Sequence, residues 1–284
     1  MQKLEVFQSL WAMERRQPDG VELSLPEIFE KVAGGGYDGI GIDTGTNDEA
    51  TVNAARPLFA EYGLASLVTA FPDSVDAMRR VLDMAASVDA RLVCVNAKVF
   101  PFTPAEGAEF VNHCLELGHD YDIPVYFDTH RLTLTTDLLY TLQLIELVPE
   151  LELVCDLSHY VVARELPEPI DVFWQGLIEQ ILDRGAGFQG RVATREQAQV
   201  PIHWPQHQYW YELFCQWWTQ GFEKWRARKP DDATLNFLCE LGPQPYALTG
   251  PDGFDLTDRW SEAQDIKTRV RDIWTDIEQK SSGA

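Results

Sequence analysis

Short apolar runs rich in β-branched and aromatic residues alternate along the chain with longer segments of helical periodicity. The short runs predict eight strands, within residues 4–11, 37–43, 64–71, 91–98, 124–131, 151–160, 187–194 and 234–242. A segment with apolar residues at helical spacing follows each run, as in residues 25–36, 48–63, 74–90 and 135–150. Strands that alternate with helices in this way predict a parallel sheet with helical crossovers.

Eight strands that each precede a helix predict an α/β fold of the closed (β/α)8 type, the TIM barrel, which commonly spans about 250 residues. A doubly wound sheet of six strands is the alternative. The glycine-rich fingerprint of such sheets is not found, because the turn after the first predicted strand has no glycine before Gly20. We find no linker, repeat or low-complexity segment, so residues 1–284 are predicted to form a single domain.

One predicted helix, within residues 204–229, is unusually rich in aromatic residues. Five of them lie close to one helical face: Trp210, Phe214, Trp217, Trp218 and Trp225. Such a face is expected to pack in the core or against a second subunit. The chain could therefore form a homo-oligomer.

Composition and charge exclude several classes of function. A chain that is 45% hydrophobic and 24% charged is typical of a soluble protein, and no apolar run approaches the ~18 residues of a membrane span. The net charge of −22 argues against nucleic acid as a partner, because binding to its backbone needs clustered Lys and Arg. The N-terminal segment lacks the pattern of a signal peptide, and five scattered cysteines suit a reducing compartment. We therefore expect a cytoplasmic protein that binds neither membranes nor nucleic acid.

Three carboxylates end predicted strands: Asp128 on the fifth, Asp156 on the sixth and Glu240 on the eighth. In a barrel of this kind the chemistry occurs at the carboxyl ends of the strands. Three carboxylates that converge there would repel one another unless a cation lay between them. Their oxygens suit Mg²⁺ or Mn²⁺, and to a lesser degree Co²⁺ or Zn²⁺. The alternative for each carboxylate alone is that it caps the loop or helix that follows.

Other polar residues at the strand ends fit a small hydroxylated ligand. They are Asp43, Lys98, His130 and Arg191, with Arg195 on the loop that follows the seventh strand. Lys98, Arg191 and Arg195 could bind a phosphate or carboxylate group. His130 could instead hold Asp128 in place. The long polar loop at residues 194–208 could act as a lid.

The segments "VYFDTHR", "VCDLSHY" and "CELGPQPY" resemble the xylose isomerase-like barrels of the sugar phosphate isomerase/epimerase superfamily. In that family a glutamate, an aspartate, a histidine and a glutamate at the ends of strands five to eight hold one divalent metal, and the two glutamates act as acid and base. The resemblance implies that Asp128, Asp156, Gln189 and Glu240 are the metal ligands. It also implies that Asp128 and Glu240 are catalytic and that His159 contacts the substrate.

Two positions depart from the family pattern. Asp128 is one methylene shorter than the family's glutamate, and Gln189 replaces the imidazole of the strand-seven histidine with a weaker amide ligand. His203 on the following loop is one possible substitute for that histidine. These departures put the usual metal chemistry in doubt without affecting the predicted barrel.

The expected function is therefore a divalent-metal-dependent isomerase or epimerase of a sugar, sugar phosphate or sugar acid. One alternative is a metal-dependent lyase or hydrolase that acts on sugars or glycosides. Another is a non-catalytic sugar-binding relative that has lost its metal, for which Asp128 and Gln189 are the indications. An abasic-site endonuclease of related fold would need a histidine-rich metal cluster and a basic groove, which six histidines and a net charge of −22 do not supply.

Overall fold

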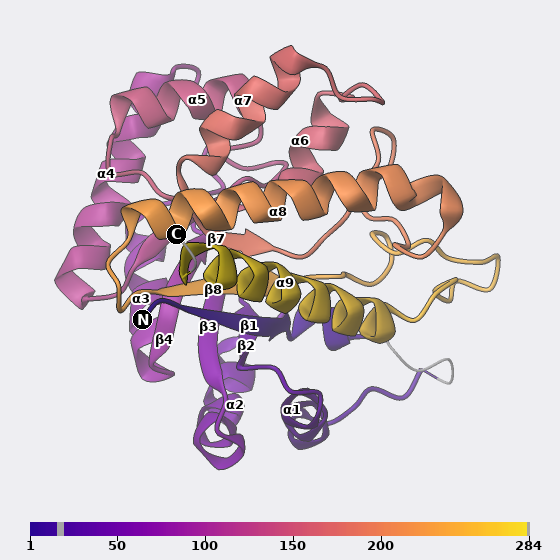
Figure 1. Ribbon diagram of the computed structural model, residues 1–284. Helices are drawn as coiled ribbons and strands as arrows, with labels where there is room; N and C mark the ends of the chain where they lie inside the picture. The colour runs from indigo at the N-terminus through magenta and orange to yellow at the C-terminus, as the bar shows by residue number, and fades with distance from the viewer. Residues whose placement is uncertain (16–19, 283–284) are drawn as a thin grey trace.

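The computed structural model describes residues 1–15 and 20–282. Eight parallel strands close into a barrel in chain order, and the helices surround it (Figure 1). The strands are β1 (Lys3–Ser9), β2 (Gly39–Asp43), β3 (Ala65–Ala70), β4 (Ala90–Val95), β5 (Val125–Asp128), β6 (Leu153–Cys155), β7 (Gly185–Gln189) and β8 (Thr234–Cys239). The predicted (β/α)8 barrel is confirmed and the doubly wound sheet is excluded, whereas the extent of the single domain, residues 1–284, stays a prediction.

The helices follow the strands along the chain. They are α1 (Leu25–Gly34), α2 (Glu49–Tyr62), α3 (Val75–Ser87), α4 (Pro104–Tyr121), α5 (Leu138–Leu147), α6 (Leu157–Ala163), α7 (Val172–Leu182), α8 (Gln208–Arg228) and α9 (Arg259–Ser282), with short 3-10 turns η1 (Trp11–Met13) and η2 (Pro205–His207). The expected strand at residues 151–160 is too long, because its second half is α6. Asp156 is the N-cap of this helix, and its side chain accepts a hydrogen bond from the Ser158 amide.

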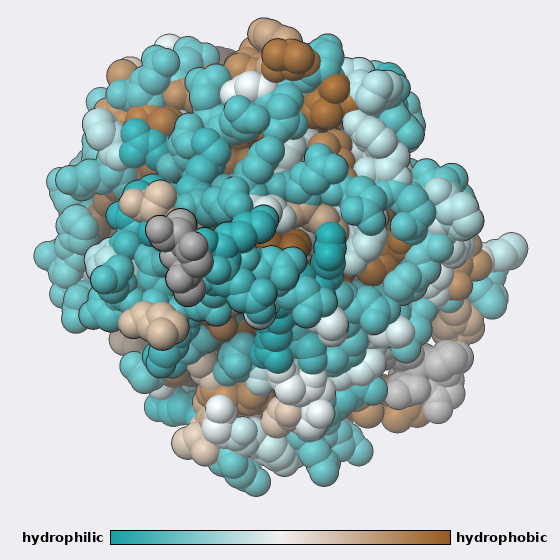
Figure 2. Space-filling view, viewed as in Figure 1, coloured by the Kyte–Doolittle hydropathy of each residue, from teal (hydrophilic) through white to brown (hydrophobic). Residues whose placement is uncertain are grey.

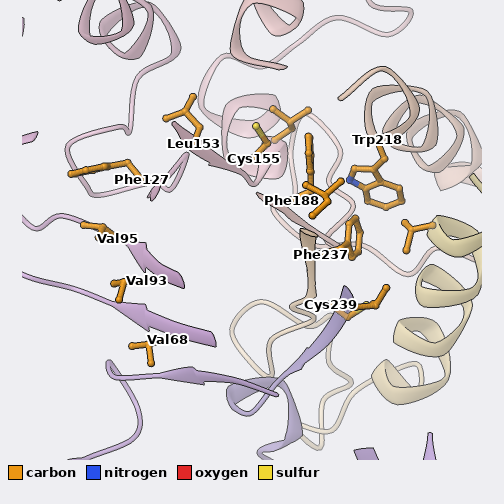
Figure 3. Close-up of a cluster of buried hydrophobic side chains, with 14 of the residues drawn as sticks. Val68, Val93, Val95, Phe127, Leu153, Cys155, Phe188, Trp218, Phe237 and Cys239 are labelled. Atoms are coloured by element: carbon orange, nitrogen blue, oxygen red, sulfur yellow. The ribbon is translucent and has the colours of Figure 1, made fainter. Parts of the chain in front are cut away.

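The layer between the strands and the helices is the larger part of the core (Figure 3). Trp218 of α8 contacts Phe237 of β8 edge to face, with ring centroids 5.4 Å apart, and Phe188 of β7 lies nearby (Figure 3). Cys155 and Cys239 also belong to this outer layer, on the side of their strands away from the barrel interior.

The aromatic face predicted for residues 204–229 is buried within the chain itself. Trp210, Phe214, Trp217, Trp218 and Trp225 are all at most 2% exposed, and α8 lies alongside α9 on the outside of the barrel (Figure 1). This face is therefore core packing and cannot serve as a subunit interface. A homo-oligomer stays a prediction, and it no longer has this helix as its support.

Trp218→Ala is expected to lower the free energy of unfolding by about 3–5 kcal/mol, because it empties a large part of the outer core. Chemical denaturation at neutral pH measures this loss. Phe173→Ala is the matched control, since Phe173 of α7 is 64% exposed, and it should change stability by no more than about 0.5 kcal/mol. Equal losses in both variants would contradict the assignment of the aromatic face to the core.

Arg259 connects the segment after β1 with the segment after β8, at the end of the barrel where the strands have their carboxyl ends. Its guanidinium donates hydrogen bonds to the carbonyl oxygens of Ala12 at 2.6 Å, Glu14 at 2.8 Å and Leu241 at 3.0 Å. Beside it, β1 pairs with β8 over residues 3–8 and 234–239. One buried side chain therefore holds the loops after β1 and β8 and the start of α9 in fixed relative positions.

A buried carboxyl group on α9 makes stability depend on pH. Burial raises the pKa of Glu262 to about 7, against the lowering effect of a hydrogen bond with Thr257. The folded state thus binds this proton more tightly than the unfolded state. The stability that proton binding contributes is therefore fully present below about pH 4.5 and is lost as the pH rises through 7. When the pH is raised from 5 to 8, the free energy of unfolding of Glu262→Gln should therefore increase by roughly 2–3 kcal/mol relative to that of the wild type. Urea denaturation of both proteins at the two pH values measures the difference; parallel pH profiles would contradict it.

The surface is mainly hydrophilic on the face seen in Figure 2, with apolar side chains grouped in a few places. Such a surface suits a chain with a net charge of −22. Among the helices of the described residues, we find none with both the length and the apolar character that a membrane crossing requires.

Candidate functional site

The interior of the barrel changes from apolar to polar at its carboxyl end. The apolar layer consists of Phe7, Leu67, Leu92, Cys94, Val154 and Leu238. Side chains two positions apart on a strand face the same side. The inner layer therefore continues, two residues further on, with Asn96, Asp156 and Glu240, all of them buried.

Strand β7 contributes two inward-facing side chains at successive levels of the barrel. Gln189 is paired in register with Leu238, so it faces inward, and Arg191 follows two residues later at the level of Glu240. Both are buried, at 1% and 0% exposure. Together with Asp128 at the end of β5, these residues bring the four predicted metal ligands to one place and add a guanidinium among them.

Asp156 is held by three groups. Its Oδ1 accepts a hydrogen bond of 3.0 Å from the Ser158 amide. Its Oδ2 lies 3.1 Å from Arg191 Nε and 3.4 Å from His159 Nε2. Burial alone would raise the pKa of Asp156, but His159 and Arg191 outweigh this effect and lower the pKa. Asp156 is therefore a charged carboxylate that already has its partners.

Arg191 forms a second ion pair and contacts two aromatic rings. Its Nη2 donates to Glu240 Oε2. Its guanidinium carbon lies 4.5 Å from the ring centre of Tyr246 and 5.7 Å from that of Trp11, as in cation–π contacts. A Cβ at Gly242 would lie 2.1 Å from the Trp11 ring, so the glycine of "ELGPQPY" leaves the room that this tryptophan needs.

Asp128 and Gln189 contact each other on the opposite side of the cluster. The Gln189 amide nitrogen donates a hydrogen bond of 2.9 Å to Asp128 Oδ2. Burial raises the pKa of Asp128 well above its usual value, and the charges of Asp156 and Glu240 add to this effect. Burial also raises the pKa of Glu240 to about 7, although Arg191 opposes it. Burial therefore raises the pKa of both predicted catalytic carboxyl groups.

The predicted histidines lie together at the edge of the cluster. The rings of His130 and His159 have centroids 4.1 Å apart, and Tyr246 OH lies 3.5 Å from His130 Nε2. The Nδ1 of His130 faces the Arg131 carbonyl oxygen at 2.6 Å, so this nitrogen carries the proton. Burial, with His159 next in effect, lowers the pKa of His130 to about 2. His130 is therefore a neutral imidazole that contacts His159 and Tyr246; its predicted contact with Asp128 is not among its hydrogen bonds.

The remaining predicted ligand-binding residues are more peripheral. Asp43 ends β2, where burial raises its pKa to about 6 and the Gly45 amide donates to it at 2.7 Å. Lys98 donates to the Leu132 carbonyl oxygen at 3.1 Å. Arg195 lies 3.1 Å from Glu196 and 3.7 Å from Glu165, so its charge is already paired outside the buried cluster.

The loop after β7 is fastened at its middle. Gln199 is buried, donates to the Gly242 carbonyl oxygen at 3.0 Å and accepts from the Gly242 amide at 2.8 Å. His203 pairs with Asp265 of α9 at 2.9 Å, so it does not take the place of the missing strand-seven histidine. The predicted lid is thus tied to the loop after β8 in this structure.

The four predicted metal ligands converge, but they do not fit a divalent ion. Asp156 and Glu240 are paired with Arg191, and Gln189 turns its amide nitrogen toward Asp128. Over residues 1–15 and 20–282, no group of three or more His, Cys, Asp or Glu side chains is arranged to hold a metal. The resemblance predicted a metal centre, whereas these contacts place a guanidinium between two of its ligands.

Sequence reasoning missed several residues of this site. Trp11 and Tyr246 both lie near the Arg191 guanidinium. Arg131 also lies near Tyr246, with its guanidinium carbon 4.5 Å from the ring centre. Tyr246 belongs to the segment "CELGPQPY", but loop residues have no periodicity from which their direction could be predicted. Arg191 was expected to bind substrate, and its position two residues after Gln189 was the available signal that it faces Glu240.

Comparisons with known proteins support the fold. No protein-family model and no curated protein matches the chain. Solved structures that match include D-allulose 3-epimerase from Methylomonas sp. in complex with D-allulose, at 12% identity over 96% of this chain and 97% of that one, with a TM-score of 0.59. A xylose isomerase-like TIM barrel protein from Mycobacterium smegmatis in complex with magnesium matches at 14% identity over 94% and 97%, with a TM-score of 0.59.

A sugar phosphate isomerase/epimerase from Parabacteroides distasonis matches at 10% identity over 95% of both chains, with a TM-score of 0.60. The fold is therefore that of the xylose isomerase-like TIM barrels, as the sequence resemblance predicted. At identities this low, the likeness concerns the fold and does not extend to the activity.

Proposed function

We propose that this protein is an isomerase or epimerase of a small polyhydroxylated carbonyl compound, such as a sugar, sugar phosphate or sugar acid. Asp128 and Glu240 are the proposed acid–base pair. Structural neighbours that are themselves sugar epimerases or isomerases support this general class. Free, buried cysteines, among them Cys94, Cys155 and Cys239, support a reducing compartment such as the cytoplasm.

One observation carries the proposal: buried polar atoms without hydrogen-bond partners gather at this end of the barrel. Among the described residues they include Asn96 Oδ1, Asp128 Oδ1, His159 Nδ1, Gln189 Oε1 and Arg191 Nη1. Buried polar atoms normally have partners, because an unpaired one costs about 1–3 kcal/mol. Donors and acceptors left open side by side suit a ligand with several hydroxyl and carbonyl oxygens.

The proposed reaction is a proton transfer next to a carbonyl group. Glu240, whose pKa of about 7 suits a general base near neutral pH, takes the proton from the carbon beside the carbonyl, and the electron pair of that C–H bond moves to form an enediolate. The open Nη1 donor of Arg191 is suited to hold the oxygen on which negative charge develops. Asp128 then returns a proton. In epimerisation the proton goes to the same carbon from the opposite face. In isomerisation it goes to the former carbonyl carbon, and the hydroxyl proton passes from one oxygen of the enediolate to the other, so that the new carbonyl group forms at the carbon that lost its proton.

Metal dependence is not part of this proposal, because the four predicted ligands do not fit an ion. Every step is assigned to side chains of the chain itself. Aldoses and ketoses are the first substrates to test, and their phosphates and acids follow. Lys98 and Arg131, at the edge of the cluster, are the proposed binding partners of an anionic substituent on the substrate.

Incubation with a panel of ketoses and aldoses in D2O tests the proposal. The expected result is deuterium at the carbon next to the carbonyl, detected by NMR, together with an isomerised or epimerised product. Cleavage products would instead favour the lyase or hydrolase alternative. Saturable binding of a sugar without deuterium exchange or product would favour the non-catalytic alternative, and either outcome would overturn the proposed reaction.

A further inference from the structure

We propose that the guanidinium of Arg191 is a built-in cation that takes the place of a divalent metal among the strand-end carboxylates. The site of this protein would then be complete without a metal ion. Arg191 lies at the level of Glu240, two residues after Gln189 on β7, beside the residues that the resemblance assigns to the metal, and it is itself fully buried. Because metal uptake and turnover are measured separately, the metal-free site and the proposed reaction can fail separately.

The contacts of Arg191 are those that a bound cation would make. Its Nε lies 3.1 Å from Asp156 Oδ2, and its Nη2 donates to Glu240 Oε2. Two carboxylates, at the ends of β6 and β8 on either side of β7, are thus bridged by one planar group that is always charged. Three carboxyl groups in a buried layer need a compensating positive charge, and the chain supplies it in cis.

The surroundings hold the guanidinium in this position. Tyr246 and Trp11 lie near it at 4.5 and 5.7 Å between guanidinium carbon and ring centre, and their ring centroids are 5.3 Å apart, so the two rings together cover one side of the guanidinium. Gly242 is needed to admit Trp11. Because Arg191 bridges two carboxylates and contacts two aromatic rings, its guanidinium is held between the carboxylates and does not leave them free to bind an ion.

The two departures from the family pattern agree with this assignment. Gln189 supplies a neutral amide where the family has an imidazole, and its amide nitrogen is directed to Asp128 at 2.9 Å, where a metal ligand would present a lone pair. Asp128 is shorter by one methylene than the family's glutamate. The neutral amide weakens a metal site, and both changes are compatible with a site organised around Arg191.

Metal uptake by the wild type and three single variants tests the proposal. Each protein is incubated with excess Mn²⁺, Mg²⁺, Co²⁺ or Zn²⁺, desalted and analysed for metal, and Co²⁺ affinity is measured by titration calorimetry. The wild type is expected to keep no stoichiometric metal, and neither EDTA nor Co²⁺ should change its thermal midpoint. Arg191→Met is expected to bind Co²⁺ at least about tenfold more tightly than the wild type, because Asp156 and Glu240 become free ligands.

Two further variants make the test specific. Gln189→His supplies the missing imidazole but keeps Arg191, so it should still bind no metal; uptake by this variant would mean that the absent imidazole had excluded the ion. Arg195→Met removes a cation that is paired outside the cluster and should behave like the wild type. The proposal is overturned if the wild type keeps one equivalent of metal, or if a folded Arg191→Met gains no affinity for Co²⁺. If Arg191→Met does not fold, the wild type and Gln189→His still decide the question.

Discussion

Arg191→Met is expected to lower the free energy of unfolding by about 3–5 kcal/mol at neutral pH, the cost of removing one partner from a buried ion pair. Methionine fills much of the same space, so the loss measures charge more than cavity. The physical reason is that Asp156 and Glu240, which both contact this guanidinium, would be left buried without their cation. Urea denaturation followed by fluorescence, performed without divalent metals, measures the change.

Removal of the stranded carboxylates should restore part of this stability. Asp156→Asn and Glu240→Gln in the Arg191→Met background replace the charges with amides, so the triple variant is expected to be more stable than Arg191→Met alone. Arg195→Met is the matched control, because its ion pairs are partly exposed and should be worth no more than about 1 kcal/mol. A loss below about 1 kcal/mol in Arg191→Met would contradict the ion-pair explanation.

Asp128→Asn and Glu240→Gln are each expected to reduce the rate of the proposed proton transfer by about 10²–10⁴-fold. Asp128→Asn is the cleaner change, since the asparagine carbonyl oxygen can still accept the hydrogen bond from Gln189. Glu240→Gln also weakens an ion pair with Arg191, so its folded fraction must be measured before its rate is interpreted. Deuterium incorporation into the substrate gives the rate directly.

The control for these rates is Glu262→Gln, which replaces a buried carboxyl group on α9, outside the cluster of Asp128, Arg191 and Glu240. It should leave deuterium incorporation unchanged. If Asp128→Asn and Glu240→Gln both kept the wild-type rate, Asp128 and Glu240 could not be the acid–base pair. If only one of them did, the proposed division of the proton transfer between Asp128 and Glu240 would be wrong.

The barrel and the convergence of its carboxylates could be predicted because the order of apolar and polar residues shows where the strands are and which side chains share a face. Asp156 and Glu240 follow Val154 and Leu238 by two residues, and this spacing alone directs them inward. Strand ends were less predictable. Residues 157–160 were included in the expected strand, but a helix begins there, and Asp156 caps it.

The partners of each charged group could not be predicted from the same pattern. Arg191 was expected at the site, but that it bridges Asp156 and Glu240 depends on the rotamer of a long side chain. The positions of Trp11 and Tyr246 depend on irregular loops. The aromatic face of α8 was ambiguous for a different reason, because a core helix and an interface helix show the same spacing.

The closure of the barrel has a consequence for synthesis on the ribosome. The seam joins residues 3–8 to residues 234–239, and Arg259 binds carbonyl oxygens near both strands. A nascent chain cannot form these contacts until more than two hundred residues have emerged. One edge of β1 therefore stays unpaired while the rest of the barrel is translated. Final closure is therefore expected only after β8 and Arg259 have been translated, and β1 is the strand whose unpaired edge a chaperone would need to protect until then.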